Sequence, residues 1–304
     1  MSKNNIATII YLKDKLHKWK NIAILSLIFS IILTLKFIFA GPELSASGDE
    51  FIAEVNIEGV IFQNKYRSKV LEKIAKDDKI KAVLVNINSP GGGIVGSEVL
   101  YENLKNISLS KPIVVLMGSV AASGGYMAAM ASDHVIARNG TLTGSIGVIM
   151  ESPNVAELAE KVGVKFNSYK SSPLKAAPSL FENPSEYVNK VIQSSIDDSY
   201  SFFVSLVMDS RAKKINKKYQ KIAFDGRVFT GRQALKVGLI DKIGGKKEAL
   251  DYLSKQNIDK DLALKEVKIY KEEKNFIERM FSKVPFFDKF SSIDRSSQIM
   301  AIMQ

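Results

Sequence analysis

One serine in a glycine-rich stretch is the strongest candidate for chemistry in this chain. Ser123 lies near the end of the segment Gly118 to Gly125 (GSVAASGG), directly before two glycines and a run of small residues. A serine at the start of a helix meets free backbone amides and the positive end of the helix dipole, which both favour developing negative charge. Ser123 is therefore the candidate nucleophile of the sequence.

Two more glycine-rich turns lie on either side of it along the chain. They are Ser89 to Gly93 (SPGGG) and Thr143 to Gly147 (TGSIG). All three turns stand at the ends of predicted strands, where ligands bind in an open α/β sheet. The free amides of a Pro-Gly-Gly-Gly loop can also point at an oxyanion, because glycine leaves nothing to block the approach. Any one loop can be a simple tight turn, but three in succession indicate a site.

A serine nucleophile needs a base, and histidine, the usual base, is scarce here. Only His17 and His134 exist. His17 precedes a predicted membrane segment, and His134, with Asp133 beside it, is predicted to form the turn into a strand. A lysine can serve instead if burial lowers its pKa from about 10.4 by roughly three units. The residues alone leave the choice open between Lys165, Lys170 and Lys175.

Other kinds of chemistry find no support in the residue types. The chain has no cysteine, so disulfides, thiolate metal sites and a cysteine nucleophile are impossible. Two histidines do not make a multi-histidine metal centre. The phosphate-loop pattern is absent, and Gly91 to Gly96 lacks the acidic residue that completes a dinucleotide fingerprint. We expect no metal and no cofactor.

The spacing of apolar residues predicts strands that alternate with helices, which is typical of a parallel sheet with helices outside. The predicted strands are 51–59, 81–88, 112–117, 135–137 and 164–170. The predicted helices are 68–75, 96–107, 123–131, 184–209 and 246–253. Together they predict one domain over residues 51–270.

The N-terminal part predicts a membrane anchor. Residues 21–40 are apolar over about the length that an α-helix needs to cross a hydrocarbon core, and Lys36 can reach the interface. Lysines within 13–20 place the N-terminus in the cytoplasm by the positive-inside rule. We therefore expect a cytoplasmic segment at 1–20, a single-pass anchor at 21–40 and a linker at 41–50. A signal peptide cleaved near Ala46 is the alternative.

The net charge of +11 is concentrated at the start of the chain. Residues 1–40 carry six lysines against one aspartate, and the remainder is only mildly basic. No basic stripe with interleaved aromatics is evident, so we do not expect nucleic-acid binding. The tail at 271–304 mixes basic with aromatic residues, and we expect it to touch the membrane or a neighbouring subunit.

Five stretches of the chain match one known family. They are NINSPGGG (Asn86 to Gly93), MGSVAASGGYMAA (Met117 to Ala129), TLTGSIGVIME (Thr141 to Glu151), YKSSPLK (Tyr169 to Lys175) and DGRVFTGRQALKVGLID (Asp225 to Asp241). In these stretches the chain resembles the signal peptide peptidase SppA family in its short, single-domain bacterial form. The stretches follow the order of the family and are distributed over residues 86–241.

The resemblance implies roles for particular residues. Ser123 matches the family's nucleophile, and Lys175 matches its general base, a choice that the residues alone do not make. Ser145 falls where the family has a hydroxyl that hydrogen-bonds the lysine. The implied oxyanion hole consists of the amides of Gly91, Gly92 and Gly124. Lys175 follows Ser-Pro-Leu, where other members have glycine, alanine and a polar residue.

The resemblance also implies a fold and a function. The fold is that of Clp protease and crotonase, an α/β fold with a parallel sheet and flanking helices. The function is that of a membrane-anchored serine endopeptidase with a Ser-Lys dyad, which degrades cleaved signal peptides and other apolar peptides through an acyl-enzyme. We expect a homo-oligomeric ring on the extracytoplasmic side of the bacterial inner membrane. A crotonase-like acyl-CoA enzyme and an inactive membrane scaffold are the alternatives.

Overall fold

The structure is a computed structural model that describes residues 15–16, 18–31 and 50–271. It divides into two units, Met1–Asp49 and Glu50–Gln304. In the first unit, residues 18–31 are helical and exposed. Within the described ranges, no helix has the length and apolar character needed to cross a membrane. The predicted anchor, linker and tail lie wholly or partly outside these ranges.

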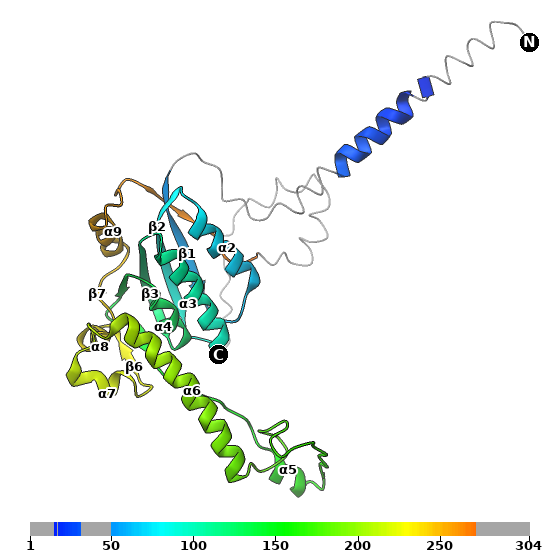
Figure 1. Cartoon of the computed structure of the whole chain (residues 1–304), viewed down its shortest axis with the longest axis vertical. Coiled ribbons are helices and arrows are strands. Elements are labelled where there is room, and N and C mark those ends of the chain that lie inside the picture. Colours follow the sequence, from blue (N-terminus) through cyan, green and yellow to red (C-terminus); the bar gives the residue numbers. More distant parts are fainter. Residues whose placement is uncertain (1–14, 17, 32–49, 272–304) are drawn as a thin grey trace, which may run out of the picture. The chain divides into compact units, whose positions relative to one another are not determined.

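A largely parallel sheet forms the centre of the second unit (Figure 1). Its main path runs β6-β5-β3-β2-β1-β8, while β4 pairs with β3 and with β7. Every pairing is parallel except that of β5 with β6. The strands are β1 (Phe51–Glu58), β2 (Ile80–Ser89), β3 (Ile113–Ala122), β4 (His134–Ala137), β5 (Leu142–Gly144), β6 (Val228–Thr230), β7 (Lys242–Ile243) and β8 (Ala263–Glu266).

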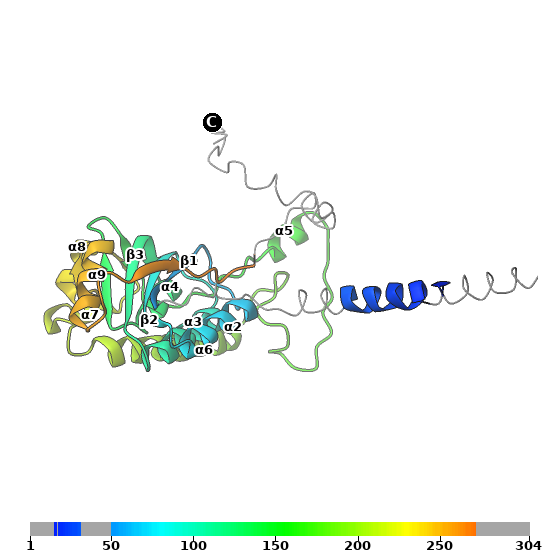
Figure 2. The ribbon, with the colours of Figure 1, turned by 90° about the horizontal axis from the view of Figure 1, so that it is seen from above.

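The central strands are apolar on both faces because helices cover them. Helices α2 (Lys65–Lys76) and α3 (Ile94–Ser108) lie side by side along the sheet in both views (Figures 1 and 2). Helix α9 (Lys246–Lys255) packs on a cluster of sheet residues through Ala249 and Leu253. Those sheet residues are Ile52, Ala82, Leu84, Val114 and Ile136.

Two further helices lead to and from the carboxyl ends of the strands. Helix α4 (Gly124–Ala129) follows β3 directly and is buried throughout. Helix α6 (Glu186–Arg211) is long, and its buried residues gather near its C-terminal end, with Val188 alone near its start. The N-terminal half of α6 therefore extends beyond the body of the domain (Figure 1).

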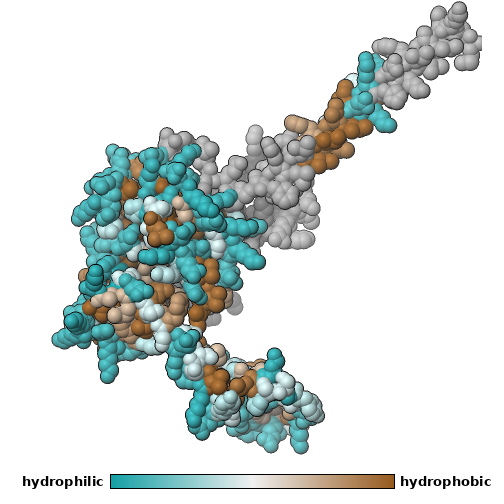
Figure 3. Space-filling view, viewed as in Figure 1, coloured by the Kyte–Doolittle hydropathy of each residue, from teal (hydrophilic) through white to brown (hydrophobic). Residues whose placement is uncertain are grey.

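Residues 150–185, which we call the arm, project at the far end of α6 (Figure 1). The arm contains α5 (Ala156–Lys161), which has no buried residue, and it displays apolar side chains on its surface (Figure 3). The rings of Phe166 and Phe181 stack with their centroids 3.8 Å apart, and this contact joins two segments of the arm. The strand predicted at 164–170 is wrong, because the arm has no sheet beside it with which to pair.

A buried carboxylate ties the C-terminal end of α6 to β4. Asp241 accepts hydrogen bonds from Arg211 Nη1 (2.7 Å), Lys214 Nζ (2.7 Å) and the amide of Val135 (2.8 Å). Burial alone would raise the pKa of the Asp241 carboxyl, but the two cations outweigh it and hold this pKa below its ordinary value. The short helices between α6 and β7 are η1 (Lys217–Tyr219), α7 (Gln220–Ala223) and α8 (Gly231–Val237).

Candidate active site

Ser123 occupies the sharp turn between β3 and α4. Its backbone has φ 50° and ψ −121°, a conformation that few residues with a side chain adopt. Two hydrogen bonds hold it there: its amide donates to Gly144 O (2.9 Å), and its carbonyl accepts from the amide of Met127 (2.9 Å). Backbone strain of this kind clusters at functional sites, and a strained strand-to-helix turn can present a serine hydroxyl at a sheet end.

The Pro-Gly-Gly-Gly turn packs directly against this serine. Gly91 has φ +108°, and a Cβ on it would lie 2.9 Å from Ser123 Cβ and 2.8 Å from the amide nitrogen of Gly124. Such distances leave no room for a side chain, so glycine is required at this position for both its conformation and its contact. The structure therefore brings together the first two glycine-rich turns that the sequence singles out.

Two backbone amides beside Ser123 are free to bind an oxyanion. A Cβ built on Gly124 would lie 3.3 Å from the amide nitrogen of Gly92, so the two glycines are neighbours. Neither amide donates a hydrogen bond to any residue that the structure describes. Gly124 is also the first residue of α4, where the helix dipole adds positive potential. A pair of free amides next to a serine hydroxyl is the arrangement that stabilises a tetrahedral intermediate.

Three residues that the sequence reasoning missed hold this loop in place. The buried Ser89 Oγ accepts a hydrogen bond from the amide of Gly91 (3.1 Å). The buried Ser97 Oγ donates to Gly93 O (3.0 Å). Ile61 accepts from Gly93 and donates to Gly91, at 3.1 Å and 2.8 Å. Ser89 belongs to a turn that the sequence did single out, whereas no local pattern marks Ser97 or Ile61.

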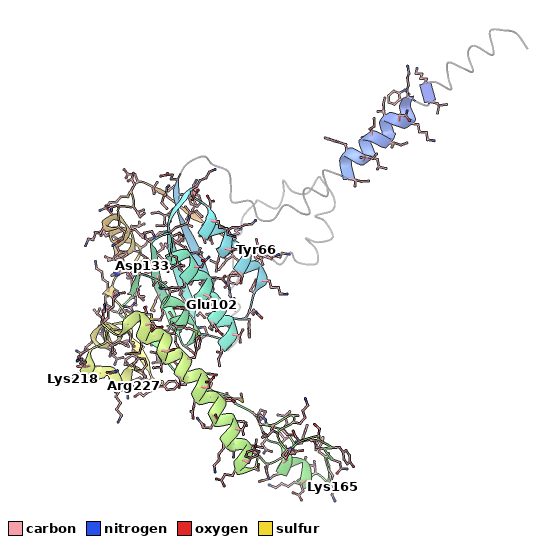
Figure 4. The ribbon with its side chains drawn as sticks, viewed as in Figure 1. Tyr66, Glu102, Asp133, Lys165, Lys218 and Arg227 are labelled. Carbon is pink, nitrogen blue, oxygen red and sulfur yellow. The ribbon has the colours of Figure 1, made fainter. Side chains whose placement is uncertain are left out.

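Ser145, in the third glycine-rich turn, shares a pocket with Ser123. Ser145 has φ 51°, and its amide donates to Arg227 O (2.9 Å). The pocket measures about 500 Å³ and lies between this turn, helix α6 and the loop before β6. Its other lining residues are Pro90, Ile146, Gly147, Val148, Ile149, Ile196, Asp197, Tyr200, Phe224, Asp225 and Gly226. Figure 4 shows Arg227 near this end of the domain.

Lys175 lies on the arm and does not line the pocket of Ser123. Its side chain is exposed, and its ammonium makes no hydrogen bond or ion pair with the described residues. The start of α6 at Glu186 is ten residues, or about 15 Å of helix, beyond the pocket residue Ile196. Lys165, on the same arm, marks its distal end in Figure 4. Within one chain, the structure does not bring Lys175 to Ser123.

His134 is far from Ser123. It is paired with Val114 at the opposite end of β3, nine residues or about 30 Å of extended strand from Ser123. Its Nδ1 lies 3.8 Å from Asp241 Oδ2, and its ring stacks on Tyr252. Burial lowers the pKa of His134, although Asp241 opposes that shift. The sequence predicts His134 in the turn before a strand, and the structure makes it the first residue of β4.

The fold and the site together define a class of protein: an α/β protein with a largely parallel sheet, whose strained serine and two free glycine amides are suited to acyl transfer. Among the residues that the structure describes, no cluster of acidic or histidine side chains could hold a metal ion. The Clp protease family model matches residues 57–140, which run from the end of β1 through β4. The model of peptidase family S49 matches residues 105–259, about half of the chain.

The chain belongs to peptidase family S49, the signal peptide peptidase SppA family, and it is a serine peptidase. It is 41% identical to a protein named as a protease in Synechocystis sp., over 65% of this chain and 71% of that protein. It is 42% identical to a protein named signal peptide peptidase SppA in Enterococcus faecium, over 61% of this chain and 54% of that one. This family assignment rules out the acyl-CoA enzyme alternative.

The solved structures give a more distant likeness. A membrane-bound stomatin-specific protease, 1510-N, is similar with a TM-score of 0.46 and 16% identity, over 72% of this chain and 98% of that one.

Proposed function

We propose that this serine peptidase is a membrane-anchored Ser-Lys enzyme that cleaves apolar peptides such as the remnants of signal peptides. One observation carries the proposal. The strained Ser123 stands beside the free amides of Gly92 and Gly124 at the carboxyl end of a parallel sheet. That arrangement suits acyl transfer to a serine, with the developing oxyanion between the two amides.

The mechanism follows from these positions. A neutral lysine takes the proton of the Ser123 hydroxyl, and the oxygen attacks a peptide carbonyl. The amides of Gly92 and Gly124 bind the oxyanion, and Gly91 keeps the turn close enough for both to reach it. The lysine returns the proton to the leaving amine, and water then releases the acyl group. Ser145, at the wall of the same pocket, is suited to orient the lysine ammonium.

The lysine of this mechanism is Lys175, and we propose that a second copy of the chain supplies it. A lysine acts as a base only when it is withdrawn from water, and Lys175 is exposed on an arm that leads away from its own Ser123. A neighbouring copy in a ring could insert this arm into the site and desolvate the ammonium. One chain would then provide the nucleophile and the next chain the base.

The surface of the arm supports this assembly. Several apolar side chains of the arm are exposed, and contiguous exposed apolar patches mark interaction sites. The exposed apolar residues of the arm and the adjoining start of α6 are Leu158, Val162, Val164, Phe166, Tyr169, Leu180, Phe181, Tyr187 and Val191. A second exposed apolar group, beside the Gly91 to Gly93 loop, could receive them: Val60, Phe62, Ile94 and Val95.

The pocket of Ser123 supports apolar substrates. Ile146, Ile196 and Phe224 contribute apolar walls, and Tyr200 is tied to the backbone carbonyl of Phe224. An extended peptide running along the sheet end would place one side chain in this pocket and its scissile carbonyl over Ser123. An anchor at residues 21–40 would hold the site near the membrane, where apolar segments are produced.

A serine-reactive fluorophosphonate probe tests the nucleophile. We expect the full chain to be labelled and to cleave an apolar peptide, and Ser123→Ala to lose both properties. Ser119→Ala is a matched control from β3, the strand that leads to Ser123, and we expect full labelling of it. A folded wild-type protein that takes up no probe would support the inactive scaffold instead.

Lys175→Ala tests the base. Removing general-base catalysis typically costs 10²–10⁴-fold in rate, and we expect a loss in that range with little change in the unfolding curve, since the side chain is exposed. Lys170→Ala is the control, because Lys170 is paired with Glu182 within the arm. Full activity of Lys175→Ala would contradict the dyad.

A further inference from the structure

A buried arginine lies behind the loop that holds the oxyanion amides. Arg67, in the first turn of α2, is 2% exposed. Its Nη2 donates to the carbonyl of Phe62 (2.7 Å), and its Nη1 donates to the hydroxyl of Tyr270 (3.4 Å). Among the described residues, no carboxylate pairs with Arg67, and its buried Nε has no hydrogen-bond partner.

Within the described residues, the charge of Arg67 meets no counter-charge, only the carbonyl of Phe62 and the hydroxyl and ring of Tyr270. A buried charge without a counter-charge is costly, and a well-packed apolar side chain of similar volume usually serves stability as well or better. The other fully buried arginine, Arg211, has the carboxylate of Asp241 beside it. The difference between the two suggests that the hydrogen bond from Arg67 to the main chain of the loop is what matters.

The carbonyl that accepts this hydrogen bond belongs to Phe62, the residue after Ile61, and Ile61 contacts the oxyanion loop, Gly91 to Gly93. Ile61 precedes Phe62, and its amide donates to Gly91 O (2.8 Å) while its carbonyl accepts from the amide of Gly93 (3.1 Å). Ile61 thus forms a bridge with Gly92 in the manner of parallel strands. The guanidinium holds the main chain at 62, and residue 61 holds the glycine loop on both sides of the Gly92 amide.

Ile61 and the glycine loop are packed too closely for one to move without the other. A Cβ on Gly92 would lie 2.1 Å from Ile61 O, and one on Gly96 would lie 2.8 Å from the carbonyl carbon of Phe62. The main chain at 61–62 therefore packs directly on the glycine loop and on the start of α3. A shift at Phe62 must displace Gly92, because nothing flexible lies between them.

We propose that Arg67 is a positioning residue that sets the Gly92 amide in the oxyanion hole through Phe62 and Ile61. The inference rests on the proposed role of Gly92. Arg67 touches neither substrate nor the reacting atoms. Its effect should appear in transition-state binding, where the oxyanion exists, and not in ground-state binding.

The test compares Arg67→Lys with Arg211→Lys in the full chain. The lysine at 67 keeps a positive charge but loses the fork that reaches Phe62 O and Tyr270 together. Active sites are counted by fluorophosphonate labelling, so that misfolded protein does not enter the rate. We expect kcat per active site to fall about tenfold in Arg67→Lys with KM unchanged, a fraction of the loss seen when an oxyanion donor is removed outright. We expect Arg211→Lys to stay within twofold of wild type.

A peptide aldehyde supplies the second readout. It forms a hemiacetal with the serine and places an oxygen in the oxyanion hole, so its inhibition constant should rise by the same factor as kcat falls. A folded Arg67→Met variant should show a larger fall in kcat and a matching larger rise in the inhibition constant. Equal kcat and equal aldehyde inhibition in wild type and Arg67→Lys would overturn the inference. Loss of labelling in Ser123→Ala alongside that result would show that only the role of Arg67 has failed, and persistent labelling would show that the proposed site itself has failed.

Discussion

At the scale of single residues, the site depends on backbone conformation more than on side-chain type. Ser123 holds an unfavourable φ and ψ that costs of order 1–3 kcal/mol, and it does so because Gly144 and Met127 bind its amide and carbonyl. At Gly91 and Gly124, the absence of a side chain lets the two glycine-rich turns of the same chain pack in direct contact. A side chain at these positions would displace the nucleophile or the amides that serve it.

Two adjacent glycines allow this dependence to be tested. We expect Gly92→Ala to lose about 10²–10³-fold in kcat, the range for a lost oxyanion donor, because its Cβ would collide with Ile61 O. Gly93→Ala is the matched control, since a Cβ there meets nothing within 4 Å. Steady-state kinetics together with thermal unfolding of each variant would separate a loss of catalysis from a loss of stability. Equal loss of activity in both variants would show that the glycine loop does not act through Gly92.

The candidate nucleophile and the glycine turns could be predicted from the sequence because their signal is local. A serine followed by two glycines after an apolar run points to a strand-to-helix turn. The residues that hold the oxyanion loop could not be predicted in the same way. Arg67 and Ile61 lie 25 and 31 residues before Gly92 in the sequence, and their contacts with the loop depend on how the strands align.

At the scale of elements, Asp241 joins three parts of the fold that are far apart in the sequence. Arg211 closes α6, Val135 lies in β4, and Asp241 leads into β7. Helix α6 also carries Ile196 and Tyr200 to the pocket of Ser123, whereas Arg211 and Asp241 do not line that pocket. The side chains are 1% and 10% exposed, so solvent screens the attraction little.

Replacement of this carboxylate should have a pH signature. The pKa of Asp241 is held below its ordinary value in the folded chain, so its contribution to stability is complete above the unfolded pKa of about 3.9 and is lost as pH falls through the folded pKa. We expect Asp241→Asn to lose about 3–5 kcal/mol at pH 7, as when one partner of a buried pair is removed. Chemical denaturation between pH 7 and pH 3 measures both quantities.

The stabilities measured at acidic pH, together with a second variant, provide the control for that experiment. The wild-type protein should lose stability more steeply than Asp241→Asn as pH falls below 4, so that the two curves converge. Asp225→Asn should leave the unfolding free energy nearly unchanged, because the Asp225–Arg227 pair is exposed. Parallel curves for wild type and Asp241→Asn would contradict the role given to this carboxylate.

Most elements could be predicted because their apolar spacing is strong. The predicted strand 81–88 and helix 184–209 differ from β2 and α6 by only one or two residues at each end. The prediction failed at 164–170, where alternating residues lie on an arm with no sheet to pair with. It also stopped β3 at residue 117, since the small residues up to Ala122 show no apolar run although they pair with β5.

At the scale of the whole molecule, one chain holds only part of the proposed chemistry. Ser123 and the two free amides lie together on the body, while Lys175 lies on the arm, exposed and outside the pocket of Ser123. The resemblance to a family could indicate Lys175 as the base, but it could not place the lysine relative to Ser123. That placement depends on the direction in which α6 leaves the body, which no sequence pattern encodes.

The most direct test mixes two inactive proteins. Ser123→Ala keeps Lys175 and Lys175→Ala keeps Ser123, so subunits exchanged between them can rebuild a site only if serine and lysine come from different copies. For random exchange in equal amounts, about a quarter of the sites should regain both residues, and peptidase activity should rise towards a quarter of the wild-type value. A mixture that exchanges subunits yet stays as inactive as its components would contradict the account.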